Sequence, residues 1–317
     1  MTASKPKAHS LPKFGILWDG GTGVSPGFVL GSLMPAMNRH PDASWTRRIA
    51  GGHWQIVFFL ILSSFAEAAP EWQNELTSSA PGPFARLAPT VLDLEVTWNG
   101  TVNAGSIRME FSPAGAKKPG LFVARSAVAS HGAAAVLFPY HSSFWSELDP
   151  ATLRPRYFHA TETSQKEAIH TTVRHFPEHV ESREVTQLFK TGRIRETTRS
   201  FPFTPAFDVF SALLHVRSQR LDPGDHLTLV IHPFDNPYLL RIKVQGREIH
   251  NGRKAIRLAV GLQKIDRNTL QLLPYKKLKR DANLWLSDDA HRIPIELRAA
   301  ALIGDVRATL VRQTSPN

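Results

Sequence analysis

The chain has 317 residues, of which 42% are hydrophobic and 21% are charged, and its 38 Lys and Arg outnumber 27 Asp and Glu. This balance is typical of a globular protein with its own core and excludes collagen-like and low-complexity chains. The absence of cysteine excludes disulfides, thiolate nucleophiles, cysteine-ligated metals and the lipidated cysteine of a bacterial lipoprotein. Four Met against 23 Pro and 20 Gly favour strands and turns over a helical bundle.

A short apolar segment near the N-terminus has the layout of a secretory signal peptide. Two arginines at 47–48 precede an apolar core of about ten residues, and small residues at Ala66 and Ala68 follow it. The core is too short to cross a bilayer, which needs about 20 apolar residues. We therefore predict a signal peptide at 37–68 that is cleaved before Ala69, a periplasmic location, and no transmembrane span after cleavage.

The residues before this segment do not fit a signal peptide, which normally begins close to its charged region. Met34 or Met37 is therefore a better start of translation than Met1, and 1–36 is interpreted as a start-site artefact or a disordered extension. After cleavage the chain would begin with 69–89, which is rich in Ser, Pro, Gly and Ala. This composition predicts a flexible lead-in.

The rest of the chain, at about 90–312, reads as a single domain of antiparallel strands. Residues 91–98 alternate between apolar and polar side chains, and Asn99-Gly100 then supplies the two-residue turn that most strongly signals a hairpin. On the return strand, Gly105 indicates a bulge or a close backbone approach. Further alternating segments lie at 156–161, 166–176, 180–189, 193–200, 227–231, 240–244, 256–260, 284–286, 293–297 and 306–311.

Residues 206–218 alone have helical spacing, with Phe210, Leu213 and Leu214 on one face and Asp208 in the first turn. One helix against about a dozen strands predicts a mainly β fold, a large curved antiparallel meander or incomplete β-barrel. The edges of such a sheet need cover. We therefore expect the short helix to lie in the concave face.

A series of short motifs runs through this domain. It consists of Leu94-Glu-Val-Thr-Trp98, Asp208-Val-Phe-Ser-Ala-Leu-Leu-His-Val-Arg217, Gly224-Asp225, Val244-Gln-Gly-Arg-Glu248, Trp285-Leu-Ser-Asp-Asp289, Arg292-Ile-Pro-Ile295 and Gly304-Asp-Val-Arg-Ala-Thr-Leu310. In this combination the chain resembles an uncharacterised bacterial exported family, domain of unknown function 3108. That family resembles periplasmic lipoprotein carriers, which implies an incomplete antiparallel barrel around a helical plug with an apolar cavity. The resemblance implies no catalytic residues.

Three polar clusters could carry chemistry, and each has a structural explanation. Asp288, Asp289 and His291 fall between two strand patterns, where Asp side chains bond to the backbone of a turn. His175 and His179 have the i, i+4 spacing of zinc ligands on a helix. A proline between them prevents helical presentation, so we expect no metal site.

A third cluster, Ser142 and Ser143, lacks the surroundings of a nucleophile elbow and is interpreted as a polar loop before Asp149. No complete catalytic constellation remains. We therefore expect a protein without enzymatic activity, catalytic residues or cofactors. The chain also lacks a recognisable nucleic-acid-binding module, so we expect no nucleic acid partner.

Lys276, Lys277 and Lys279 form a basic run that is either a solvated loop or a site for phosphate-bearing groups. We predict a non-enzymatic periplasmic binding or carrier-like protein for an apolar or amphipathic envelope ligand, such as a lipid or lipopolysaccharide. The apolar face of the helix would contact the ligand chain, and the lysines would lie near its anionic end. The alternative is a structural or interaction protein of the cell envelope with no small ligand, whose exposed edge strand pairs with an envelope protein.

Overall fold

The computed structural model describes residues 69–317 apart from 85–86, 117, 276–279, 302–303 and 316–317. The predicted signal peptide at 37–68, the residues before it, and Lys276, Lys277 and Lys279 lie outside the described residues. None of the described helices is long and apolar enough to cross a membrane.

The described residues form one antiparallel sheet of 15 strands. Its N-terminal half contains β1 (Thr90–Trp98), β2 (Val102–Pro113), β3 (Phe122–Ser130), β4 (Tyr140–Leu148), β5 (Pro155–Ser164), β6 (Glu167–His175), β7 (Val180–Leu188) and β8 (Ile194–Phe201). Its C-terminal half contains β9 (His226–Ile231), β10 (Tyr238–His250), β11 (Arg253–Ile265), β12 (Leu272–Pro274), β13 (Ala282–Ser287), β14 (Pro294–Ala301) and β15 (Gly304–Thr314). The helical segments are η1 (Glu71–Glu75), α1 (Gly132–Leu137) and α2 (Val209–Ser218).

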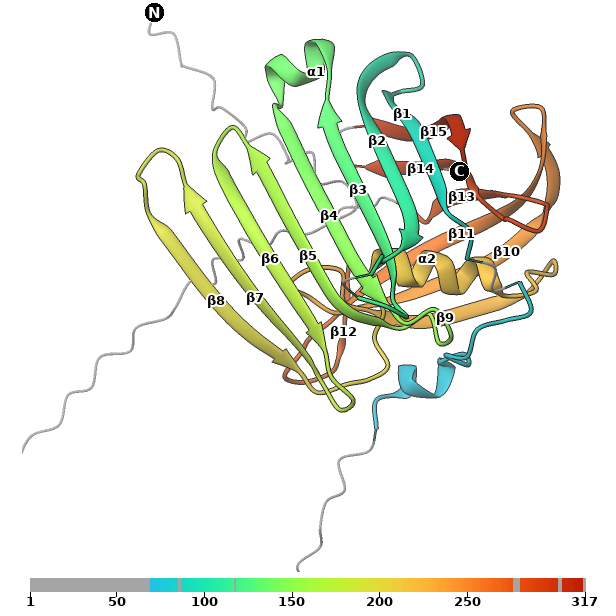
Figure 1. Ribbon diagram of the computed structural model, residues 1–317, viewed down its shortest axis with the longest axis horizontal. Helices are drawn as coiled ribbons and strands as arrows, with labels where there is room; N and C mark the ends of the chain where they lie inside the picture. Colours follow the sequence, from blue (N-terminus) through green and yellow to red (C-terminus); the bar gives the residue numbers. More distant parts are fainter. Residues whose placement is uncertain (1–68, 85–86, 117, 276–279, 302–303, 316–317) are drawn as a thin grey trace, which may run out of the picture. The chain divides into compact units, whose positions relative to one another are not determined.

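Strand order follows the sequence within each half, and the last strand returns to the first. β15 pairs with β1, so the order runs from β8 back to β1, then through β15 to β9, with β12 attached to β11 (Figure 1). The sheet does not close, because β8 and β9 remain its two edges. Helix α2 links these two edge strands along the chain and packs between the two halves (Figure 1). The predicted fold, an incomplete antiparallel barrel with a short helix in its concave face, is confirmed.

Two hairpins turn at an Asn-Gly pair, and the first of these pairs is the turn predicted above. Asn99-Gly100 has φ of +51° and +73°, and Asn251-Gly252 has +49° and +75°. Positive φ at both positions is typical of the type I′ turn, whose backbone twist matches the twist of the two strands that it joins. The predicted close approach at Gly105 is also confirmed, since a Cβ there would lie 2.3 Å from the carbonyl oxygen of Ala129.

Strands β3 and β4 and helix α1 were not indicated by the sequence pattern. The inward positions of β3 include Ala124 and Ser126, which carry little hydrophobic signal. The interpretation of Ser142 and Ser143 as a loop is wrong, because both lie within β4. Pairing with β3 and β5 along nearly the whole strand outweighs the polar composition of this segment.

Helix α2 begins three residues after the predicted start at Ala206. Asp208 is its N-cap and accepts hydrogen bonds from the backbone N–H groups of Phe210 (2.9 Å) and Ser211 (2.8 Å). The Ser211 hydroxyl accepts in return from the N–H of Asp208 at 2.8 Å, which completes a capping box. Phe207 stays extended because its backbone bonds to β9.

The segment before β1, for which the composition predicts flexibility, makes long-range contacts with the domain. The buried Trp72 donates its indole N–H to the carbonyl of Leu270 at 2.8 Å, and the N–H of Gly82 donates to the hydroxyl of Ser218 at 2.9 Å. These partners lie 198 and 136 residues away in the sequence. Composition reports local tendencies only, so it carries no signal for such contacts.

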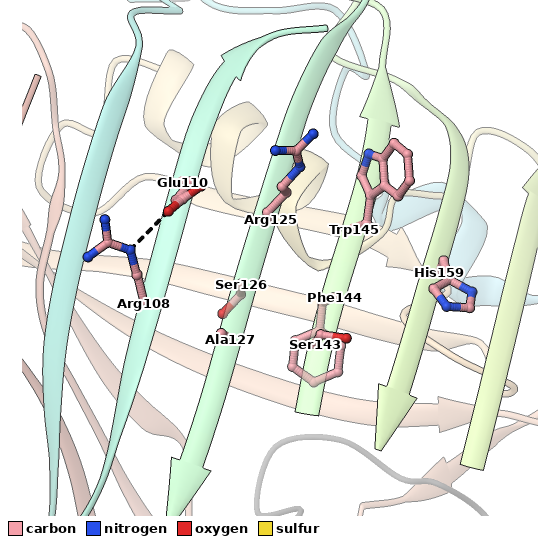
Figure 2. Close-up of a pocket in the computed structure, with 9 residues that line it drawn as sticks. All are labelled: Arg108, Glu110, Arg125, Ser126, Ala127, Ser143, Phe144, Trp145 and His159. Atoms are coloured by element: carbon pink, nitrogen blue, oxygen red, sulfur yellow. Dashed lines mark hydrogen bonds and ion pairs between the residues drawn. The ribbon is translucent and has the colours of Figure 1, made fainter. Parts of the chain in front are cut away.

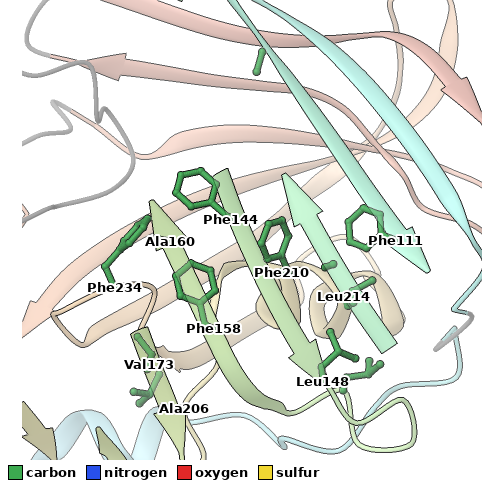
Figure 3. Packing of buried hydrophobic residues seen from close by; sticks show 14 of the residues in the cluster. Phe111, Phe144, Leu148, Phe158, Ala160, Val173, Ala206, Phe210, Leu214 and Phe234 are labelled. Atoms are coloured by element: carbon green, nitrogen blue, oxygen red, sulfur yellow. The ribbon is translucent and has the colours of Figure 1, made fainter. Parts of the chain in front are cut away.

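The core near α2 is rich in phenylalanine. Figure 3 shows Phe144 and Phe158 of the sheet, Phe234 of the β9–β10 loop and Phe210 of α2 gathered together. Phe158 lies 5.6 Å from Phe234 and 6.4 Å from Phe210 between ring centroids. Offset and edge-on ring pairs of this kind stabilise the fold beyond their buried area. They fix α2 against the N-terminal half of the sheet.

Candidate ligand-binding cavity

The concave side of the sheet encloses a cavity of about 240 Å³ between α2 and strands from both halves. Its wall consists of apolar side chains with Ser126 as the single polar member: Leu94, Ile107, Met109, Val128, Phe144, Val209, Phe210, Ala212, Leu213, Val216, Ile231, Phe234, Leu240, Ile242, Val260, Leu262, Ala282, Leu284, Pro294, Leu297 and Ala308. Pockets that hold small apolar ligands have this kind of lining.

The period of two along each strand accounts for this wall. Leu240 and Ile242 on β10 lie directly opposite Leu262 and Val260 on β11, and all four line the cavity. Side chains two residues apart share one face of a strand, so the alternating pattern of the sequence becomes a continuous apolar surface.

Part of this wall is incompletely buried. Nine aliphatic members remain partly exposed: Ile107, Met109, Val128, Val209, Leu213, Val260, Leu262, Leu284 and Leu297. In a closely packed core such side chains would be covered by their neighbours. Here they border on free volume, so apolar surface remains available to a ligand.

Ionisable groups next to α2 lie behind the apolar wall. Asp208 is fully buried, and burial raises its pKa despite hydrogen bonds from the helix N-terminus and from Ser146. Burial lowers the pKa of His215 to about 4, so its ring is neutral at pH 7. The buried Arg217 donates to the carbonyl of His291 at 2.6 Å, and burial lowers its pKa to about 10.

None of these groups lines the cavity, and no other ionisable side chain does among the described residues. The cavity wall therefore offers van der Waals contacts and one hydroxyl.

The predicted ligand-binding residues fall into three groups. Phe210 and Leu213 line the cavity. Leu214 is buried in the adjacent core and lies outside the lining. The lysines of the basic run are outside the described residues.

The Asp288, Asp289 and His291 cluster of the sequence lies in a turn. One oxygen of the Asp289 carboxylate accepts hydrogen bonds from the N–H groups of His291 (2.8 Å) and Arg292 (3.0 Å) and from the Ser287 hydroxyl (2.9 Å). Asp289 is therefore a turn residue, as its pattern predicts.

His175 ends β6, and His179 lies in the following turn, where its ring stacks on Phe176 at 4.6 Å. Within the described part of the chain, no group of three His, Asp or Glu side chains is arranged to hold a metal ion.

Sequence reasoning missed most of the cavity wall, including Val128 on β3 and Ala308 on β15. Alternation identifies which residues face inward, but it does not distinguish an inward residue that touches a neighbour from one that borders on empty space. Only the spacing between the two halves of the sheet and α2 decides this.

The fold and the cavity together define an open, barrel-like antiparallel β protein with an apolar interior. The family described as a protein of unknown function (DUF3108) matches the chain over residues 93–311, more than half of its length, and the chain belongs to this family. The family expected from the sequence motifs is thereby confirmed.

One solved structure that is similar to the chain is that of a beta-barrel-like protein of domain of unknown function DUF1849 from Brucella abortus. The two chains are 11% identical and superpose with a TM-score of 0.47, over 73% of this chain and 99% of the other. No curated protein matches the chain.

Proposed function

We propose that this protein is a non-enzymatic binding or carrier-like protein that holds one apolar or amphipathic molecule in the cavity beside α2. The observation that carries the proposal is the cavity wall, in which Ser126 is the single polar member and nine aliphatic side chains retain exposed surface. Covering such surface stabilises a complex by about 25 cal/mol per Å². A lipid acyl chain has the chemistry that this wall favours.

A binding role is supported over catalysis by the arrangement of the polar groups. The buried Asp208 is committed to capping α2, and Arg217 to a backbone carbonyl. Neither group faces the cavity. A ligand would therefore be held and released without chemical change.

We also propose that the protein acts in the periplasm after cleavage of the signal peptide before Ala69. This part of the proposal is supported by the order of charge, apolar core and small residues in 37–68. N-terminal sequencing of the exported protein tests it, with Ala69 as the expected first residue. Recovery of the uncleaved chain from the cytosol would refute it.

The binding proposal is tested by titrating the mature protein with a fluorescent fatty acid and, separately, with a fluorescent phospholipid. We expect saturable binding of one molecule per chain, and native mass spectrometry of freshly purified protein should show a co-purified lipid. The first variant is Ala308→Leu, which fills the cavity. The matched control is Ala259→Leu, which adds the same atoms on the face of β11 that points away from the cavity.

Ala308→Leu should weaken probe binding by about tenfold or more, since the added side chain occupies ligand volume. Ala259→Leu should leave binding unchanged. The carrier proposal fails if neither probe binds saturably, or if both variants bind as the original chain does.

A second role, pairing with an envelope protein, is favoured by one edge of the sheet. β9 is covered, because Thr77 and Phe207 bond to its backbone, whereas no described strand pairs with the outer side of β8. Ile194 at the start of β8 is 65% exposed. If no lipid binds, site-specific cross-linking from Thr198 on β8 should yield a discrete protein adduct in the producing cell.

A further inference from the structure

A second hollow, of about 350 Å³, lies on the convex face of the sheet over β2, β3, β4 and β5. Figure 2 shows the side chains around it. The members that carry the argument are Arg108, Arg125, Ala127, Ser143, Trp145 and His159. A volume of this size fits a small molecule.

The register of the strands explains why the surface is hollow here. Arg125, Trp145 and His159 lie side by side in one cross-strand row. In the neighbouring row, Ala127 and Ser143 lie side by side. Two small side chains next to three large ones leave a depression that is floored by the small row and walled by the large one.

The two arginines of this hollow differ in their partners. Arg108 donates to Asp93 at 3.0 Å and to Glu110 at 2.9 Å, so its charge is compensated. Arg125 has no acidic partner within ion-pair distance among the described residues, because Glu110, which lies opposite it on β2, pairs with Arg108 instead. The guanidinium of Arg125 lies 5.6 Å from the ring centroid of Trp145. The guanidinium of Arg125 is therefore available to an anion, and it already lies beside a flat aromatic surface.

Trp145 adds a second indication of binding. Its side chain is 36% exposed on the convex face, although a tryptophan gains most by being covered. Ser143 supplies a hydroxyl at the floor, and His159 supplies a ring nitrogen at the wall. A carboxylate or phosphate is the natural partner of a guanidinium, and a flat ring is the natural partner of an indole face.

We infer that this hollow is a binding site for a small anion that carries a flat ring. The acidic group pairs with Arg125, and the ring lies against Trp145 above Ala127 and Ser143. The site is on the opposite face of the sheet from the apolar cavity. Ser126 and Phe144 border both hollows, but Arg125, Ser143 and Trp145 line only the convex one.

The test uses 1-naphthoate, which carries a ring and a carboxylate, in isothermal titration of the mature protein. Acetate, which has the charge without the ring, and 1-naphthalenemethanol, which has the ring without the charge, are the matched probes. We expect 1-naphthoate to bind at one site at least about tenfold more tightly than either probe, since a charge-assisted hydrogen bond and a ring contact each contribute.

Three variants locate the site. Arg125→Gln removes the cation and Ser143→Leu fills the floor, and each should weaken binding of 1-naphthoate about tenfold or more. Arg174→Gln removes an exposed arginine of β6 outside the lining and should leave binding unchanged. All three positions are exposed, and an unchanged thermal midpoint verifies that each variant is folded.

The inference is overturned by the absence of saturable 1-naphthoate binding, by equal affinity for acetate, or by unchanged affinity in both Arg125→Gln and Ser143→Leu. Binding that is lost in Ala308→Leu but retained in Ser143→Leu would place the probe in the interior cavity. That result would also refute the site on the convex face.

Discussion

Strands β2, β3 and β4 carry apolar side chains on one face of the sheet and charged and aromatic side chains on the other. On the concave face, Ile107, Met109 and Phe144 line an apolar cavity, while Arg108 and Trp145, their neighbours in the chain, line a charged and aromatic hollow on the convex face. Successive side chains of a strand point to opposite faces, so one alternating pattern specifies both surfaces. Neighbouring positions in this region should therefore respond very differently to substitution.

The largest difference is expected between Phe144 and Trp145. Phe144 packs against Phe158 and Phe234 in the core, so Phe144→Ala should lower the free energy of unfolding by about 3–5 kcal/mol. Trp145→Ala, one residue later on the convex face, should lower it by less than about 1 kcal/mol. Urea denaturation of both variants measures this, and equal losses would contradict the assignment of the two faces.

A smaller difference is expected between Gly105 and Ser106 on β2. A Cβ at position 105 would lie 2.3 Å from a backbone oxygen of β3, so Gly105→Ala forces the strands apart and should cost about 1–3 kcal/mol. Ser106→Ala, which removes a hydrogen bond to the exposed His131, should cost less than about 1 kcal/mol. Thermal and urea unfolding would show whether the close approach of β2 and β3 is present in solution.

The smallest effect, measured over one pH unit, is a dependence of stability on pH that should separate interior from surface histidines. Burial is the main cause that lowers the pKa of His232 to about 3, against 6.5 for an ordinary histidine, and the positive charge of Arg267 acts in the same direction. The folded state resists protonation of His232, whereas the unfolded state does not. The free energy of unfolding is therefore unaffected by His232 above pH 6.5. It decreases by about 1 kcal/mol per unit as the pH falls from 6.5 toward 3.

Urea unfolding at pH 7, 6 and 5 tests this dependence. His232→Leu should reduce the loss of stability between pH 6 and 5 relative to the original chain. Part of the loss should remain, because burial also lowers the pKa of His175 to about 3 and of His215 to about 4. The control variant His170→Gln changes an exposed histidine of β6 and should retain the original slope. An unchanged slope in His232→Leu would show that another group is responsible.

Strand alternation, turn residues and the helix could be read from the sequence because each depends on neighbours close in the chain. Asn99-Gly100 and Asn251-Gly252 adopt the positive φ angles that their turns require. Phe210 and Leu213 lie on one face of α2, as their spacing predicts, and both line the cavity. β4 was missed because its segment is rich in serine, and its strand conformation depends on pairing with β3 and β5.

The amino-acid sequence by itself determined the fold class, the position of the helix within three residues at its start, and the family. The tertiary structure alone decided that β15 pairs with β1, that the segment at Trp72 binds near Leu270, and where empty space remains. Local patterns depend on backbone geometry over a few residues. A cavity instead depends on distances between side chains that are far apart in the chain, which no local pattern specifies.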